Sequence, residues 1–279
     1  MLRKKFLLKV VGDYAWEQYV QQETRSKKQE AWVMLDEFQD KRFDVLTEVR
    51  RFIQKFVARR ADRILVPSRY LAGIVGGWGI AEGKIEIVYN SCEIPALPAR
   101  EAARRSLDLS GTVVISAGRL VPWKGFQVLI DAVADLKEEM PDLHLVIAGS
   151  GPDEKNLRHV IAERGIGDRV RLTGAIPHED LLLYFAASDL FVLNSGYEGL
   201  SHTLLEALTS GLPVVASRVG GNPEVLGDGT RGILIGYNDL EQLKAAIRKT
   251  VGMPRAAVKE WPYTKERMIE ATAETLKTI

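Results

Sequence analysis

Short apolar runs that alternate with helical periodicity dominate the chain from about residue 110 onward. The periodic segments predict helices at 126–139, 153–164, 178–187, 203–210, 223–226 and 240–251. The apolar runs predict strands at 113–117, 143–148, 170–173, 190–193, 214–217 and 232–235. Strands that are apolar on both faces, separated by helices, are typical of a parallel sheet covered on both sides. The sequence therefore predicts a doubly wound α/β domain.

The first third of the chain is less regular. A buried strand is predicted at 6–11, helices at 16–25 and 44–60, and strands at 64–66 and 85–89. Ser68 is predicted to cap a helix that ends at Gly76 and Gly77. Residues 90–100 contain two prolines and no periodicity, which indicates a linker. The tail from 263 to 279 is predicted to form a last helix.

The predicted helix 44–60 has an unusual distribution of side chains. One face carries Val45, Val49, Phe52, Ile53, Phe56 and Val57, and the basic residues Arg50, Arg51, Lys55, Arg59 and Arg60 cover much of the rest. Such a basic surface is either a solvated face or a patch that contacts anionic lipid or a phosphorylated acceptor.

Composition narrows the class of protein. With 279 residues, 46% of them hydrophobic and 27% charged, the chain resembles an ordinary soluble globular protein of one or two domains. A net charge of +1 gives no general reason to expect a nucleic-acid partner. The single cysteine excludes an internal disulfide framework and a cysteine-built zinc site, and it fits a reducing, cytoplasmic compartment. No apolar run reaches the roughly 18 to 20 residues that span a bilayer.

Ligands of open parallel sheets bind at the carboxyl ends of the strands, so the loops that follow the strands hold the candidate chemistry. The loop SAGRLVPWKGF has Gly118 at the strand end and Arg119 and Lys124 before the next helix. Two cations beside a helix N-terminus suit a diphosphate, although solvent-facing charges are the alternative interpretation. In the next two loops, AGSGP and TGAIPHED, Gly149, Gly151 and Gly174 permit either tight turns or close approach of a ligand.

The stretch GYEGLSHTLLEALTSGLPVVAS contains two glutamates, Glu198 and Glu206. Ser201 or Thr203 is expected to cap the helix, which places Glu206 near the positive end of a largely buried helix. A buried carboxylate needs hydrogen-bond donors, because leaving it unpaired costs several kcal/mol. The donors are either protein groups or the hydroxyls of a bound sugar.

These motifs resemble a known family. GRLVPWKG, AGSGP and YEGLSHTLLEALTSGLPVVAS followed by GGNPE are similar to the nucleotide-sugar domain of family-four retaining glycosyltransferases, which have the two-domain GT-B architecture. Glu198 and Glu206 match that family's pair of glutamates separated by seven residues. The resemblance covers residues 109–251 well and residues 9–89 more loosely.

The resemblance implies a role for each matched residue. Arg119 and Lys124 would hold the donor diphosphate and neutralise the leaving nucleoside diphosphate. Glu198 would bind hydroxyls of the transferred sugar, and Glu206 would bind the ribose diol. The nucleotide and its phosphates would be framed by Gly118, Gly149, Ser150, Gly151, Gly174, Ile176, Gly199, Leu200 and Ser201. The family generally works without a bound divalent metal, so neither a metal nor another cofactor is expected.

The N-terminal part departs from the family pattern, because it is short by several strands and lacks the expected glycine-rich loop. We therefore predict a GT-B fold of two Rossmann-like doubly wound sheets, the first incomplete. The predicted domains are an acceptor-side part at 1–95, a nucleotide-sugar domain at 96–260 and a helix at 261–279 that packs back on the first part. Where the family often has a histidine facing the donor sugar, the chain has Asp13, which is predicted to be an acceptor-facing carboxylate.

The leading functional hypothesis is a retaining hexosyltransferase that moves a sugar from a nucleotide-sugar donor to a hydroxyl acceptor. The acceptor is a glycan, a lipid-linked saccharide or a small molecule, and no nucleic-acid partner is expected. A lipid-linked acceptor implies peripheral contact with the cytoplasmic face of a membrane. A second hypothesis is a truncated or split chain that binds a nucleotide sugar without catalysis. A third, a sugar-nucleotide epimerase of related architecture, fits the cationic loop and the glutamate pair less well.

Overall fold

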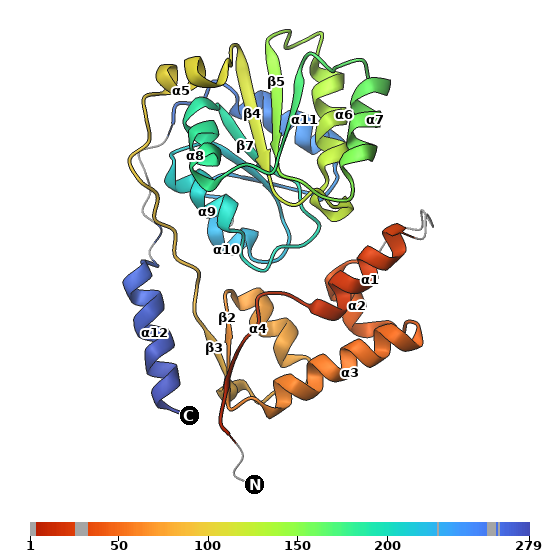
Figure 1. Cartoon of the computed structure of the whole chain (residues 1–279), viewed down its shortest axis with the longest axis vertical. Helices are drawn as coiled ribbons and strands as arrows, with labels where there is room; N and C mark the ends of the chain where they lie inside the picture. Colours follow the sequence, from red (N-terminus) through yellow and green to blue (C-terminus); the bar gives the residue numbers. More distant parts are fainter. Residues whose placement is uncertain (1–3, 26–32, 228, 256–260, 262) are drawn as a thin grey trace. The chain divides into compact units, whose positions relative to one another are not determined.

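The computed structural model describes residues 4–25, 33–227, 229–255, 261 and 263–279. The chain divides into two compact units, each described here by itself (Figure 1). Unit 1 comprises Met1–Ser91, Tyr197–Leu200 and Tyr263–Ile279, and unit 2 comprises Cys92–Gly196 and Ser201–Pro262. The short segment Tyr197–Leu200 therefore belongs to unit 1, although both of its chain neighbours belong to unit 2.

Unit 2 contains a six-stranded parallel sheet. Its strands are β4 (Thr112–Ala117), β5 (Leu143–Ala148), β6 (Val170–Gly174), β7 (Leu190–Leu193), β8 (Val214–Ser217) and β9 (Ile233–Ile235). Their order across the sheet is β6-β5-β4-β7-β8-β9, and every neighbouring pair is parallel. The chain thus builds outward from β4 to β6 and then returns to the other side of β4.

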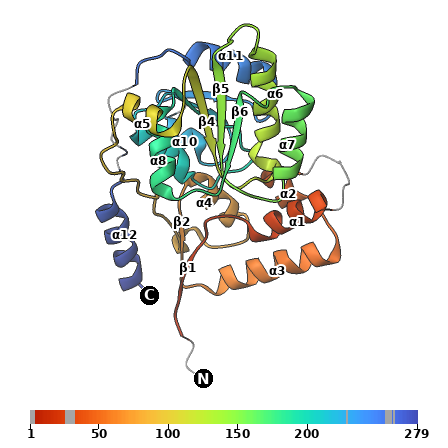
Figure 2. The ribbon, with the colours of Figure 1, turned by 45° about the horizontal axis from the view of Figure 1, so that its top comes forward.

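Helices cover both faces of this sheet, as the sequence predicts (Figures 1 and 2). They are α5 (Arg100–Leu107), the 3-10 turn η2 (Pro122–Lys124), α6 (Phe126–Leu136), α7 (Glu154–Glu163), α8 (His178–Ala187), α9 (His202–Thr209), α10 (Asn222–Leu226) and α11 (Leu240–Thr250). Helices α7 and α11 lie on either side of α6, whereas α8 contacts α5, and α9 contacts α10. The strands are buried on both faces because each face has its own layer of helices.

The main core of unit 2 joins the sheet to α6, α7 and α11. Alternate strand residues, such as Leu145 and Ile147 on β5, point into this core, and Leu129, Leu157 and Ile247 meet them from the three helices. The residues between them, such as Val146, are also buried, on the opposite face. This arrangement explains why the strands are apolar throughout rather than alternating.

Unit 1 contains a three-stranded parallel sheet with the order β1-β2-β3, formed by β1 (Leu7–Lys9), β2 (Arg63–Val66) and β3 (Ile85–Ile87). Its helices are α1 (Tyr14–Arg25), α2 (Leu35–Asp40), α3 (Val45–Arg60), α4 (Arg69–Gly76) and α12 (Lys265–Lys277), together with the 3-10 turn η1 (Glu82–Lys84). The tail joins this unit through the stacked rings of Tyr89 and Tyr263, whose centroids are 4.2 Å apart.

The prediction of a buried strand at 6–11 is wrong in length and in burial. Strand β1 has three residues and lies at an edge of the sheet among the described residues. Leu7 and Leu8 are half-buried, and Val11, beyond the strand, is exposed. A run of apolar residues predicts a strand, but only its neighbours decide whether that strand is central or at an edge.

Helix α3 presents its apolar face outward. Phe52 is 68% exposed, and Val45, Val49, Ile53, Phe56 and Val57 are exposed as well. The inward face instead carries Thr47, Arg51 and Ala58. The expectation that Arg51 belongs to a basic surface is therefore wrong, because its guanidinium is buried and donates to the backbone carbonyls of Lys41 and Gln39.

Candidate functional site

The strand order of unit 2 reverses between β4 and β7, which start the two halves of the sheet. Helices that follow these strands leave toward opposite faces, so a crevice opens at the carboxyl ends of the strands. The unit 2 loops there are residues 118–125, after β4, which contain Arg119 and Lys124, and residues 194–196, after β7. Ser201, also in unit 2, precedes the next helix.

A cavity of about 560 Å³ lies beside this point, at the carboxyl ends of β4, β5 and β6. Its walls include most of the predicted nucleotide-binding residues of the loops that follow β4, β5 and β6. They are Ala117, Gly118, Arg119, Ala148, Gly149, Ser150, Gly151, Pro152, Ala175 and Ile176, with Leu181 from α8 and Thr203 from α9. We call this the switch-point pocket.

Backbone contacts between neighbouring loops explain the glycines in its wall. A Cβ on Gly149, whose φ is +146°, would lie 1.9 Å from the carbonyl oxygen of Gly118, and one on Gly151 would lie 2.2 Å from that of Leu120. The two loops are also hydrogen-bonded, since the N–H of Leu120 donates to the carbonyl of Ser150 at 2.9 Å. Gly149 and Gly151 are therefore required by close approach of backbone to backbone.

Gly174 does not line the pocket, although it was predicted to frame the nucleotide. Its carbonyl accepts a hydrogen bond from the N–H of Gly149 at 2.9 Å, which ties the loop after β6 to the loop after β5. The loops after β4, β5 and β6 thus form one hydrogen-bonded wall. Such a wall holds its backbone groups at fixed positions.

The loop after β4 is also fixed to the loop after β7. Gly125 has a left-handed φ of +62°, and a Cβ there would lie 2.1 Å from the carbonyl oxygen of Asn194. The side chain of Asn194 donates to the carbonyl of Gly125 at 3.1 Å. The N–H of Gly196 donates to the carbonyl of Trp123 at 2.7 Å. These contacts hold Trp123 and Gly125, the residues on either side of Lys124, where the turn η2 ends.

The two predicted cations lie on this braced loop. Arg119 lines the switch-point pocket and is exposed, and it forms no ion pair with a carboxylate in the described part of the chain. The Lys124 stem is half-buried, and its Cε lies 3.7 Å from where a Cβ on Gly118 would stand. A Cβ at position 118 would therefore make only an ordinary contact with the lysine stem, and the φ of +154° is what favours glycine there.

Glu206 has a protein partner. Its side chain is 16% exposed, and its Oε1 lies 2.9 Å from Nε2 of His178, the first residue of α8. Sequence reasoning left protein donors and sugar hydroxyls open, and the structure supplies a protein group for one carboxylate oxygen. His178 itself was missed. The sequence feature that could have identified it is its position in IPHED, at the start of the helix that follows β6.

Helix α9 begins at the pocket. Ser201 is its N-cap, because its Oγ accepts a hydrogen bond from the N–H of Leu204 at 3.3 Å. The hydroxyl of Thr203, the other predicted cap, lies 3.0 Å from Oγ of Ser201 and lines the pocket. The free N–H groups of the first helical turn favour an anionic group at this end.

The predicted residues Glu198, Gly199 and Leu200 lie in unit 1. Glu198 is buried. A Cβ on Gly199 would lie 2.5 Å from the carbonyl oxygen of Val11, so this backbone too is closely packed. The carbonyl of Leu200 accepts a hydrogen bond from the side chain of Asn90 at 3.4 Å. Burial raises the pKa of the adjacent Tyr197 hydroxyl well above its usual value.

Asp13 is 1% exposed and both of its carboxylate oxygens are engaged. Oδ1 accepts a hydrogen bond from the N–H of Trp16 at 3.0 Å, as a helix N-cap does, and Oδ2 accepts one from the side chain of Gln39 at 3.0 Å. The structure thus gives Asp13 a role in holding α1 to α2. Its role at an acceptor stays a prediction.

Two features are absent from the described residues. No group of three or more histidine, cysteine, aspartate or glutamate side chains there is arranged to hold a metal ion. Within the same residues, no helix combines the length and the apolar character needed to cross a membrane.

A doubly wound sheet with a pocket at its switch point defines a class of nucleotide-binding α/β proteins. Comparison with solved structures places the fold within that class. The Anabaena protein HepE in complex with UDP and glucose aligns with a TM-score of 0.79, at 20% identity over 99% of this chain and 72% of that chain. Sucrose-phosphate synthase from Thermosynechococcus elongatus aligns with a TM-score of 0.74, at 23% identity over 99% of this chain and 67% of that chain. The fold is GT-B, which confirms the predicted fold class.

Sequence comparison gives the family. The model of glycosyl transferases group 1 matches residues 99–273, and the chain belongs to this family. A GDP-mannose-dependent alpha-(1-6)-phosphatidylinositol monomannoside mannosyltransferase of Mycolicibacterium smegmatis is 36% identical over 152 residues, 52% of this chain and 40% of that protein. A D-inositol 3-phosphate glycosyltransferase of Corynebacterium efficiens is 34% identical over 207 residues, 69% of this chain and 49% of that protein. The chain therefore spans about half the length of these curated relatives.

Proposed function

We propose that this protein transfers a hexose from a nucleotide-sugar donor to a hydroxyl acceptor, with retention of configuration and without a bound metal. The observation that carries the proposal is the switch-point pocket, whose braced wall brings Arg119 beside backbone N–H groups and the start of α9. Membership of the glycosyl transferases group 1 family supports it. So does the presence of UDP in the complex of the similar protein HepE.

In the proposed reaction, Arg119 and Lys124 act on the donor diphosphate. Breaking the glycosidic bond leaves negative charge on the leaving nucleoside diphosphate, and two cations held in place beforehand stabilise that charge as it develops. Asn194 and Gly196 hold Gly125 and Trp123, the residues on either side of Lys124, so little reorganisation is needed when the bond breaks. These two cations take the role that a divalent metal has in other transferases.

The glutamates are proposed to recognise the two sugars of the donor. Glu206 accepts hydrogen bonds from the ribose hydroxyls, with His178 holding one of its oxygens. Glu198 binds hydroxyls of the transferred hexose. The backbone of Gly149–Gly151 and the side chain of Ile176 frame the base, since both line the pocket.

The ribose assignment has a direct test. We would measure the affinity of UDP and of 2′-deoxy-UDP for the wild type and for Glu206→Ala by calorimetry. A hydrogen bond to a charged group contributes about 1.5–3 kcal/mol, so the variant should lose about tenfold or more in affinity for UDP and much less for the deoxy analogue. Equal losses for the two nucleotides would refute the assignment.

The catalytic role of Lys124 is tested by turnover. We would screen nucleotide sugars for release of the nucleoside diphosphate, and then compare Lys124→Ala with Lys137→Ala, a control at the end of α6. The proposal predicts that kcat falls by orders of magnitude in Lys124→Ala and stays within about twofold in the control. Activity that persists in EDTA supports metal independence, and loss that Mg²⁺ or Mn²⁺ restores would contradict it.

A second candidate function is a chain that binds a nucleotide sugar without catalysing transfer. Saturable binding of a nucleoside diphosphate without turnover of any donor in the screen would support this candidate over the first.

The acceptor is proposed to be a glycan, a lipid-linked saccharide or a small hydroxyl compound. The exposed apolar side chains of α3, with Arg50 and Arg60 on the same helix, favour contact with an anionic lipid surface. We would measure flotation with vesicles of phosphatidylcholine, with and without phosphatidylglycerol. Binding should need the anionic lipid and be lost in Phe52→Ser. Equal flotation of the wild type and the variant would contradict the contact.

A further inference from the structure

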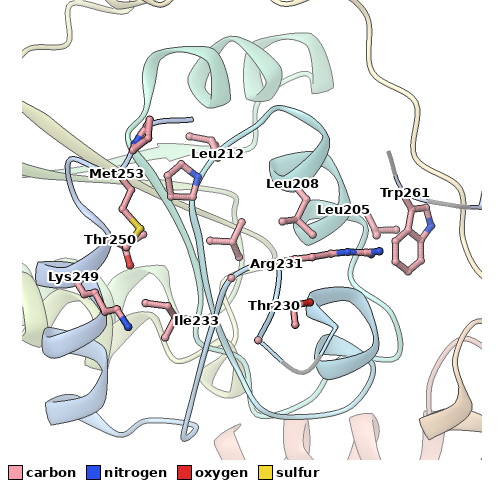
Figure 3. Close-up of a pocket in the computed structure, with 15 residues that line it drawn as sticks. Leu205, Leu208, Leu212, Thr230, Arg231, Ile233, Lys249, Thr250, Met253 and Trp261 are labelled. Carbon is pink, nitrogen blue, oxygen red and sulfur yellow. The ribbon is translucent and has the colours of Figure 1, made fainter. Parts of the chain in front are cut away.

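A second pocket lies at the opposite ends of the strands of unit 2. It has a volume of about 320 Å³ and is bordered by Val214 and Ile233, the first residues of β8 and β9. The end of α9 contributes Leu205 and Leu208, and the end of α11 contributes Thr250 (Figure 3). We call it the α9 pocket. The switch-point pocket lies at the carboxyl ends of strands, so the two pockets are different sites.

The lining of the α9 pocket is apolar except for two cations and two threonines. Its apolar side chains are Leu205, Leu208, Leu212, Pro213, Val214, Ile233, Met253, Pro254 and Trp261. Arg231 and Lys249 supply positive charge, and no aspartate or glutamate belongs to the lining. Both threonine hydroxyls are already used, since Thr250 donates to the carbonyl of Ala246 at 2.6 Å and Thr230 donates to that of Gly227 at 3.0 Å. An occupant must therefore be largely apolar and carry its charge as an anion.

The position of Arg231 suits the recognition of such an anion. Figure 3 shows its side chain extending beneath Leu208 toward the ring of Trp261, and the guanidinium carbon lies 5.9 Å from the centre of that ring. The stacked ring limits the directions in which the guanidinium can point. One N–H donates to the carbonyl of Val225 in a long hydrogen bond of 3.4 Å, which leaves other donors of the planar group for a ligand.

Helix α9 forms a wall of both pockets. Thr203, in its first turn, lines the switch-point pocket, whereas Leu205 and Leu208 line the α9 pocket. Glu206 lies between the two leucines in sequence but faces His178 instead. A ligand in the α9 pocket would therefore contact the helix that carries the proposed ribose-binding residue, without touching that residue.

We propose that the α9 pocket is a second binding site, which takes an amphipathic anion consisting of an aliphatic chain that ends in a carboxylate or a phosphate. The chain fills the space between Leu205, Leu208 and Ile233. The anionic end pairs with Arg231, because Figure 3 shows the Lys249 side chain on the other side of the pocket from the Arg231 guanidinium. The volume is at the lower end of ordinary small-molecule sites, so a single chain of about ten carbons suits it.

Calorimetric titration with three probes tests the site. Decanoate, decyl phosphate and decanol, each below its aggregation concentration, share one apolar chain and differ in charge. The two anions should bind the wild-type protein at one site, and decanol at least tenfold more weakly. Arg231→Gln should weaken binding of both anions about tenfold and leave the affinity for decanol unchanged. A preference for decyl phosphate over decanoate, or the reverse, identifies the head group.

Two further variants separate this pocket from other apolar surfaces. Leu208→Trp fills the pocket and should abolish binding, and Met253→Trp, at a side chain that is 44% exposed, blocks the rim with less risk to folding. Phe52→Ser alters the exposed face of α3 and should bind the anions as the wild type does.

The proposal is overturned if decanol binds as tightly as the anions, if folded Leu208→Trp and Met253→Trp both retain binding, or if Phe52→Ser abolishes it. UDP affinity, measured on the same samples, tests the switch-point pocket independently, so failure of one site does not imply failure of the other.

Discussion

Replacing Gly149 by alanine tests whether the wall of the switch-point pocket depends on close contact between loops. The new Cβ would lie 1.9 Å from the carbonyl oxygen of Gly118, and the backbone φ of +146° belongs to a region that residues with a side chain rarely adopt. An ordinary contact between a carbon and a carbonyl oxygen is about 3.3 Å or more. To reach that distance, either the loop after β4 moves by more than 1 Å, or the loop after β5 changes its conformation.

The expected loss of stability has two contributions, the unfavourable backbone conformation and the steric overlap of the new Cβ. A residue forced into such a backbone region costs about 1–3 kcal/mol, and forcing an extra carbon into a packed interior costs about 1–3 kcal/mol more. Gly149→Ala should therefore lower the free energy of unfolding by about 2–6 kcal/mol. Gly165→Ala is the matched control, because Gly165 has a φ of +62° but nothing within 4 Å of its Cβ position. It should lose only about 1–2 kcal/mol from the left-handed backbone.

Chemical denaturation of the two variants gives these free energies, and calorimetry gives their affinities for UDP. Gly149→Ala should also weaken UDP binding, because the displaced backbone lines the pocket, whereas Gly165→Ala should bind UDP as the wild type does. If the two variants lose the same stability and bind UDP equally well, the contact between the loops is not what requires glycine at position 149.

Three further measurements test other parts of the structure. Arg255→Ala should lower the free energy of unfolding by about 2–4 kcal/mol, because the Arg255 guanidinium donates to three carbonyls at the end of α8, each at 2.7 Å. Arg158→Ala, at an exposed ion pair, is the control and should change the free energy of unfolding by less than about 1 kcal/mol. Burial raises the pKa of the Cys92 thiol, so its reaction with a disulfide reagent at pH 8 should be slow in the native protein and should accelerate on denaturation; an equal rate would contradict the burial. The Asp44 carboxylate caps α3, and hydrogen bonds from Thr47 lower its pKa. Its contribution to the free energy of unfolding is therefore complete above pH about 4 and is lost as the pH falls further. In thermal unfolding, Asp44→Ala should remove about 1 kcal/mol at pH 7 and less at pH 3.

The sequence predicted unit 2 well because both faces of its strands are buried. Strands such as β5 are apolar at every position, and this pattern needs no knowledge of distant neighbours. The exceptions are the elements with weak patterns. Helix α5 buries only Ala103 of its own residues, so its periodicity gives little signal. In unit 1, α2 was missed for a related reason, because it has only six residues.

The sequence predicted unit 1 less well, for a physical reason. Periodicity on α3 identified the residues that share a face, but it does not say what covers that face. The apolar side chains point outward, and Arg51 is buried against two backbone carbonyls. Likewise, Asp13 was assigned from the resemblance, as the residue at the family's histidine position, whereas its cap on Trp16 follows from a local hydrogen bond.

The sequence also predicted only part of the candidate site. The resemblance of the loop motifs to the family pointed to Gly118, Arg119, Gly149, Ser150, Gly151 and Ile176, which line the switch-point pocket, and also to Gly174, which does not. Loop order contributed, since parallel strands bring their carboxyl ends to one edge. The pairing of His178 with Glu206 was missed because the two residues lie on different helices and are 28 positions apart in sequence, and no periodic pattern encodes such a contact.

The central claim is that the switch-point pocket binds the diphosphate of a nucleotide donor through Arg119 and Lys124. The most direct test is calorimetric titration of UDP and GDP into the wild type and into the double variant Arg119→Ala, Lys124→Ala. We predict saturable binding of at least one nucleotide at one site, and a loss of affinity of a hundredfold or more in the double variant, because each charge-assisted contact contributes about 1.5–3 kcal/mol. Equal affinity of the two proteins, or no binding of either nucleotide to the wild type, would contradict the claim.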